Sequence, residues 1–285
     1  MPDIFEFASI IAKFFLYISV LTAVGTVLIV PIFHVKSMNR LIVIMVVIAF
    51  LASFALYGID AIMLTGDFSG LTDPEILFLL SETASGEAFY MRMAGLSLLL
   101  TGLLISLVFN KLGKCLPVIG VLITLYSFTQ VGHMTENNSI AVSFSLFIHL
   151  LTAGLWIGIL LPLKNMALNE NCIHVAAEVA HRFGQLAIIF VPVLILAGSY
   201  MAWVTFDNIE ELITTSYGKT LLIKIFAVSI ILIVAAYNKL RFVPELREGK
   251  LDAAINLAKT INAEWAVVAF ILLTTSILTT VANPP

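Results

Sequence analysis

The chain has 285 residues, of which 60% are hydrophobic and only 12% are charged, with a formal net charge of −3. A soluble domain normally carries about 25% charged residues. A water-soluble fold of this length could not bury so much apolar surface. The composition therefore excludes a soluble globular protein and predicts one that is solvated by lipid. Two cysteines, Cys115 and Cys172, are too few for a disulfide framework.

Eight apolar stretches are long enough to cross a bilayer, which takes about 20 residues of helix. They lack strand-type alternation and are too long for barrel strands, so the fold class is all-α, a polytopic membrane helical bundle. We expect the first stretch to be retained, because it lacks the basic flank of a signal peptide. The expected spans cover residues 8–33, 41–64, 90–110, 115–133, 140–163, 183–206, 219–238 and 265–282.

The eight spans form a single membrane domain over residues 1–285, with an N-terminal four-helix half (1–135) and a C-terminal half (136–285). Small residues in the fifth span, among them Gly154 and Gly158, predict a close contact with another helix.

Basic and acidic residues alternate between successive connecting segments. Eleven of the 15 basic residues follow the first, third, fifth and seventh spans, whereas the segments after the second and sixth spans are acidic. Because Lys and Arg mark cytoplasmic segments, both termini are expected on the outer face. The chain shows no P-loop, dinucleotide fingerprint or nucleophile elbow, so we expect neither an enzyme nor a nucleic-acid-binding protein.

Histidine and methionine residues lie on the outer side of the predicted bundle. His149 lies about 13 Å inside the fifth span, and His133 with Met134 ends the fourth. Met91 and Met93 open the third span from the same side. Imidazole and thioether groups bind copper, and thioether favours Cu(I). These five residues are the candidate metal ligands. Open alternatives are a histidine that packs by hydrogen bonding or relays protons, and methionines that only fill space in the core.

Ionisable residues inside a span are functional candidates. Asp60 and Lys224 are candidates for a charge pair that fixes helix register or couples an ion, with Lys13 as a competing partner. Glu264 and Arg182 fall at predicted inner span ends, where we expect them to be solvated or ion-paired.

The second half of the chain resembles the copper resistance protein D (CopD/PcoD) family. The resemblance is carried by the order and spacing of short motifs over roughly residues 130–285. These motifs are Gly132-His133, His149 to Gly158 with Trp156-Ile157-Gly158, Arg182-Phe183, Ala197-Gly198, Ser216 to Lys219, Leu221 to Lys224, Asn238 to Arg241 with Pro244, Glu264, and Pro284-Pro285.

This resemblance implies a multi-pass protein of the bacterial inner membrane that moves copper ions from periplasm to cytoplasm, with a periplasmic copper-binding partner of the CopC type. It also implies that His133 and His149 handle the ion; the methionines are inferred from side and depth alone. A haem-binding redox protein, which would use histidine pairs on neighbouring helices, stays open, as does a copper assembly factor or sensor without transport.

Overall fold

The computed structural model describes residues 4–36, 38–106, 112–131 and 139–282, and this part of the chain is helical without a strand. The helices are α1 Ile4–Phe33, α2 Asn39–Thr65, α3 Pro74–Ser81, α4 Ala84–Ser106, α5 Leu112–Tyr126, α6 Ile140–Ala167, α7 Ile173–Thr205, α8 Glu211–Thr214, α9 Ser216–Tyr237, α10 Val243–Arg247 and α11 Leu251–Leu278. Short 3₁₀ turns lie at Phe68–Leu71 (η1), Ser127–Gln130 (η2) and Glu170–Cys172, and a π-helical turn at Asn238–Phe242.

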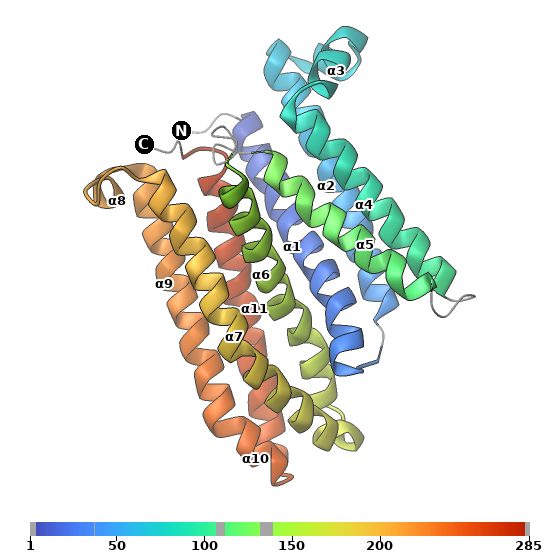
Figure 1. The fold of residues 1–285 in the computed structure, drawn as a ribbon, viewed down its shortest axis with the longest axis vertical. Helices are drawn as coiled ribbons and strands as arrows, with labels where there is room; N and C mark the ends of the chain where they lie inside the picture. The colour runs from blue at the N-terminus through green and yellow to red at the C-terminus, as the bar shows by residue number, and fades with distance from the viewer. Residues whose placement is uncertain (1–3, 37, 107–111, 132–138, 283–285) are drawn as a thin grey trace.

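The long helices run up and down in one bundle, which confirms the predicted all-α polytopic fold (Figure 1). Seven helices in the described part of the chain are long and apolar enough to cross a membrane: α1, α2, α4, α6, α7, α9 and α11. The predicted span at residues 115–133 corresponds to α5 followed by η2. Together these cover about 30 Å, close to the thickness of a bilayer core. An eighth crossing therefore stays a prediction.

The two ends of the described chain lie at the same end of the bundle as α3 and α8, while α10 lies at the opposite end (Figure 1). The predicted acidic segments thus share one end with the termini, and a predicted basic segment lies at the other. We refer to these as the outer and inner ends, and their sidedness stays a prediction from charge.

Local sequence signals set the outer turns. Asp73 caps α3 by accepting hydrogen bonds from the backbone N–H groups of Glu75 and Ile76, and Thr215 caps α9 in the same way. Asp67 caps η1 by accepting a hydrogen bond from the backbone N–H of Ser69. Hydrogen bonding by the side chain of Ser69, and then by its backbone, lowers the pKa of the Asp67 carboxyl group. The outer end therefore keeps an ionised carboxylate on its surface.

Helix α1 packs against α2, α6 and α11, so it lies between the two predicted halves. Its closest approach is to α6, where a Cβ atom on Gly25 would lie 1.8 Å from the carbonyl oxygen of Gly154. A Cβ atom on Gly158 would lie 2.1 Å from the carbonyl carbon of Gly25. The helix contact predicted from Gly154 and Gly158 is confirmed, and it is a contact between backbones.

A similar contact holds α5 against α4. A Cβ atom on Gly120 of α5 would lie 2.5 Å from the backbone nitrogen of Leu99, and one on Gly95 of α4 would lie 2.4 Å from the hydroxyl of Thr124. Close backbone packing of this kind stabilises helix pairs in lipid, where no hydrophobic effect drives them together.

We expect Gly25→Ala to destabilise the bundle by about 1–3 kcal/mol, because the added methyl group must push α1 and α6 apart. Thermal unfolding of the purified protein in detergent measures this loss. The matched control is Gly58→Ala, whose new methyl group meets only the far end of the Leu71 side chain, at 3.0 Å. Equal stability of the two variants would contradict the proposed backbone contact.

Candidate functional site

His149 lies on the face of α6 that packs against α7. Its Nδ1 atom is 3.1 Å from the carbonyl oxygen of Leu194 on α7. A carbonyl oxygen can only accept, so in the neutral imidazole Nδ1 carries the proton and Nε2 keeps its lone pair. Metal-binding histidines are typically oriented by such a bond from the other ring nitrogen. His149 is therefore held in the tautomer that can bind a metal ion through Nε2.

Gly198 makes this bond possible. It lies one turn beyond Leu194 on α7, and a Cβ atom at its position would lie 3.3 Å from Cε1 and 3.4 Å from Nδ1 of His149. These separations are tight for a side chain beside an aromatic ring. The imidazole thus reaches the backbone of α7 through the space that glycine leaves open.

Lys224 of α9 is close enough to His149 to act on it electrostatically. It lies eight residues from the first residue of α9 and His149 nine from that of α6, so both lie roughly 12–14 Å from the outer ends of their helices. Within the described residues, no ion pair joins Lys224 to a carboxylate.

Asp60 belongs to a different cluster, in the N-terminal half. Its carboxylate accepts a hydrogen bond from the hydroxyl of Ser85, and its electrostatic partners are Lys13 and Arg92. The predicted competing partner, Lys13, is thus a cation that acts on Asp60, while Lys224 acts electrostatically on His149. The structure does not bring Asp60 and Lys224 together as a pair.

The side chains around Asp60 tie the outer ends of several helices together. Arg92 donates to the hydroxyl of Ser127 at 3.2 Å, and its guanidinium carbon lies 4.8 Å from the centre of the Phe128 ring. Lys13 of α1 donates to the carbonyl oxygen of Thr279 at the end of α11, at 2.6 Å. This arrangement fits a charge network that fixes helix positions.

Met91 and Met93 do not converge. Residues two apart on a helix are rotated by about 200° around the helix axis, so they point to nearly opposite sides. Met91 lines a shallow apolar groove with Tyr126 and Phe147, whereas Met93 packs against the hydrophobic core. Phe147 precedes His149 by two residues on α6, so Met91 faces a different side of α6 from His149. His133 and Met134 lie outside the described residues.

The structure adds Met201 as a candidate ligand that the sequence did not reveal. Leu194, Gly198 and Met201 follow an i, i+4, i+7 spacing and therefore share the face of α7 that meets His149. Side chains on a helix lean toward its N-terminus, so Met201 leans from the outer end toward the level of Gly198. Met201 becomes a candidate only when the helix that faces His149 is known.

Glu264 is not at a span end, as the sequence had suggested, but in the middle of α11 and only 4% exposed. Its carboxylate accepts a hydrogen bond from Nδ2 of Asn238 at 2.7 Å and from Nε1 of Trp156 at 3.2 Å. The expectation of a solvated or ion-paired carboxylate was therefore wrong. Burial depends on which helices surround α11, and the span boundaries do not contain that information. Arg182, by contrast, is exposed, as expected.

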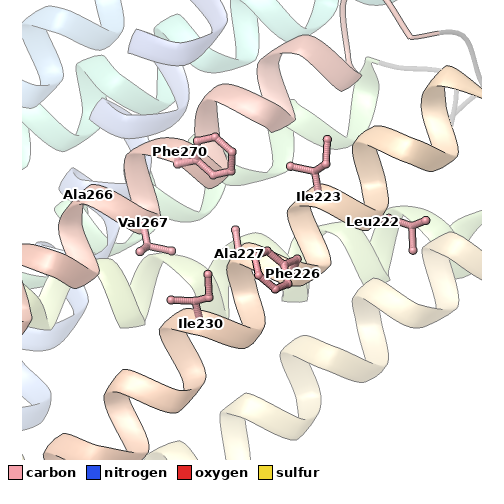
Figure 2. Close-up of a pocket in the computed structure, with 8 residues that line it drawn as sticks. All are labelled: Leu222, Ile223, Phe226, Ala227, Ile230, Ala266, Val267 and Phe270. Carbon is pink, nitrogen blue, oxygen red and sulfur yellow. The ribbon is translucent and has the colours of Figure 1, made fainter.

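Two other features do not add to the site. Among the described residues, no group of three or more His, Cys, Asp or Glu side chains could hold a metal ion. A groove of about 580 Å³ lies between α9 and α11 and is lined only by apolar side chains. Figure 2 shows these side chains, among them Phe226 and Phe270. This groove lacks His149 and offers no metal ligand.

The fold and this site define a multi-pass membrane protein with a hydrogen-bonded imidazole inside its helix bundle. Models of two protein families match the chain: "Copper resistance protein D" over residues 177–278 and "Copper resistance protein D-like, N-terminal domain" over residues 1–141. The chain belongs to the copper resistance protein D family. Leu194, Gly198, Met201, Lys224 and Glu264 lie inside the first match, and His149 lies between the two.

Two curated relatives support this assignment. "Copper transport protein CutJ" of Bacillus subtilis is 25% identical over 72% of this chain and 38% of its own length. "Inner membrane protein YebZ" of Escherichia coli is 30% identical over 53% of each chain. The chain thus spans about half or less of the relatives it matches, and no solved structure matches it. Its apolar helices and these relatives identify a multi-pass inner-membrane protein.

We expect Gly198→Ala to weaken copper binding about 10- to 100-fold, because the methyl group displaces the imidazole from the Leu194 carbonyl. Competition with a chromogenic Cu(I) chelator measures the affinity. Gly184→Ala on the same helix is the matched control, since its methyl group meets only the flexible Lys239 side chain. Equal affinities for the two variants would show that this bond does not orient a ligand.

Proposed function

We propose that the protein carries copper ions across the inner membrane toward the cytoplasm through a site built on Nε2 of His149. The observation that carries this proposal is the bond from Nδ1 to Leu194, which leaves Nε2 without a hydrogen-bond partner among the described residues. The family of the chain and a relative named as a copper transport protein favour copper as the ion. The proposed role is that of a carrier, not of an enzyme.

Soft ligands complete the proposed site. Met201 supplies a thioether from the facing helix, and His133 and Met134 are the proposed ligands from the outer segment between α5 and α6. Imidazole and thioether together suit Cu(I). Met91 and Met93 point to different sides of α4, so in this proposal each can contact an incoming ion only singly.

Charge supports the proposed direction. The outer end carries ionised carboxylates such as Asp67, which raise the local concentration of cations. An inside-negative membrane potential favours inward movement of a cation by about 2.3 kcal/mol per charge per 100 mV. A periplasmic copper-binding protein of the CopC type is the proposed donor at this acidic surface.

His149→Ala should abolish copper uptake into vesicles that contain the purified protein, because no other described residue provides an oriented imidazole at this depth. A copper-sensitive dye inside the vesicles measures uptake. His174→Ala, which removes an exposed imidazole at the inner end, is the matched control and should transport normally. Unchanged uptake by His149→Ala would remove this residue from the pathway.

Measurements on the same preparation distinguish copper transport from the two alternative functions that the sequence left open. A Soret absorption band in the purified wild-type protein would identify a haem protein instead of a carrier. Copper binding without movement into vesicles would identify an assembly factor or sensor. Either result overturns the proposed transport.

Lys224 is proposed to promote the release of copper from the site. An ammonium group near His149 repels a copper ion, and transport sites must bind loosely enough to let the ion leave. Two unit charges about 8 Å apart repel by about 2 kcal/mol at an effective dielectric constant of about 20. The site should therefore hold copper in transit and not store it.

Lys224→Met should tighten copper binding by roughly tenfold or more and slow uptake, because the repulsion is lost. Affinity is measured by chelator competition and uptake by the vesicle dye. Lys219→Met, nearer the outer end of the same helix, is the control and should change neither quantity to this extent. Weaker binding in Lys224→Met would instead make Lys224 a supporting residue.

A further inference from the structure

A second buried polar site lies in the inner half of the bundle, apart from His149. It consists of Glu264 on α11, Trp156 on α6 and Asn238, which begins the π-helical turn after α9. Trp156 and His149 are seven residues apart and therefore share one face of α6, about 10 Å apart along the helix. This inner site has no part in the copper path described above.

The charge of Glu264 has no counter-charge within the described residues. Several cations of the described chain bond to other groups. Lys239 donates to the carbonyl oxygen of Gly184, Arg182 to that of Ile32 and Lys13 to that of Thr279. Arg241 pairs with Glu245, Arg247 with Glu178 and Lys250 with Glu248, while Lys224 acts electrostatically on His149. Lys259, on α11 itself, is exposed and points away from Glu264. A buried, unpaired carboxylate is costly in a membrane, and such residues usually mark ion or proton pathways.

The side chain of Asn238 is only partly hydrogen-bonded. Its amide nitrogen donates to Glu264, but its oxygen Oδ1 is fully buried and has no donor among the described residues. Asn238 is only 7% exposed, so water does not readily supply that donor. Glu264 already accepts two hydrogen bonds. A proton on its carboxyl group would remove the negative charge and add a hydrogen-bond donor beside the unpartnered oxygen.

Aromatic rings shield the site from water on one side, and a wide backbone turn lies next to it. The Trp156 ring lies edge-on to Phe183 and Phe190 of α7, with ring centres 6.1 Å apart in both cases. Asn238 starts a π-helical turn, a wide backbone turn that is frequent at functional sites. The aromatic wall excludes water from one side, and the turn orients the amide toward α11.

We propose that Glu264, with Asn238 and Trp156, forms an exchangeable proton-binding site, and that copper at His149 expels this proton. Release breaks the O–H bond of the carboxyl group and leaves a carboxylate that accepts from Trp156 and Asn238, while the proton passes to water. The two positive charges compete because they lie in one low-dielectric bundle. The competition rests on the proposed function; the proton site itself does not.

Infrared difference spectroscopy on the full chain in lipid vesicles tests the proton site. A protonated carboxyl group has its own C=O stretching band, which shifts in D₂O when its proton exchanges. We expect the band in the wild type and in the control Glu170→Gln, which changes an exposed carboxylate, and its loss in Glu264→Gln. In Asn238→Ala the band should change frequency, because the hydrogen bond to the carboxyl group is gone.

Absence of a band that depends on Glu264, at every pH at which the protein stays folded, would overturn the proton site. So would a carboxylate signal that responds to sodium or potassium instead of pH, because the site would then hold a metal cation. A band that does not shift in D₂O would show a fixed proton and overturn exchange. Helix content by circular dichroism confirms that each variant is folded.

Adding Cu(I) to the same samples tests the competition. The Glu264 band should lose intensity in the wild type and stay unchanged in His149→Ala. If copper leaves the band unchanged in both proteins although chelator competition shows copper bound at His149, the coupling is wrong. If no copper binds at His149, the proposed function fails, while the band and its loss in Glu264→Gln still establish the proton site.

Discussion

The contact between α1 and α6 is the constraint on which the rest of the structure depends. At Gly25, Gly154 and Gly158 the two backbones touch, so neither helix can rotate or slide without a clash. Gly158 and His149 are nine residues apart and therefore point to opposite sides of α6. Packing the glycines against α1 thus turns His149 and Trp156 toward the other helices of the C-terminal half.

Because lipid is the solvent of this protein, a small number of polar groups contributes strongly to holding the helices together. The hydrophobic effect does not hold helices together in a bilayer, so close packing and hydrogen bonds must do so. Three clusters of ionisable side chains lie inside the described bundle: the charge network of Asp60, Lys13 and Arg92, the imidazole of His149 with Lys224, and the carboxylate of Glu264. The first links helix ends, and the other two place reactive groups at different depths.

The hydrogen bond from His149 to Leu194 and the two hydrogen bonds to Glu264 have a feature in common. At each site other helical segments supply fixed hydrogen-bonding partners, and one polar atom of the site has no partner among the described residues. For His149 the remaining atom is Nε2, a ligand for a soft metal ion. At Glu264 it is the oxygen of Asn238, an acceptor that lacks a donor. In our proposals the first site binds copper and the second binds a proton.

Hydropathy and charge in the sequence alone determined that this is an all-α membrane bundle, which connecting segments share a side, and that Gly154 and Gly158 meet another helix. These features follow from local composition, because a bilayer imposes helix length and backbone hydrogen bonding on every span. The resemblance to the copper resistance protein D family was also readable from short motifs, and the family matches confirmed it.

Only the tertiary structure decided which side chains face one another. It made Lys224 the electrostatic partner of His149 and Lys13 that of Asp60. It also turned Met91 and Met93 to different sides of α4, put Met201 on the face of α7 that meets His149, and buried Glu264 against Trp156 and Asn238. Apolar helices in lipid have nearly uniform surfaces, so their rotation cannot be read from periodicity. It is set by contacts between distant parts of the chain, above all by the glycines at which two backbones touch.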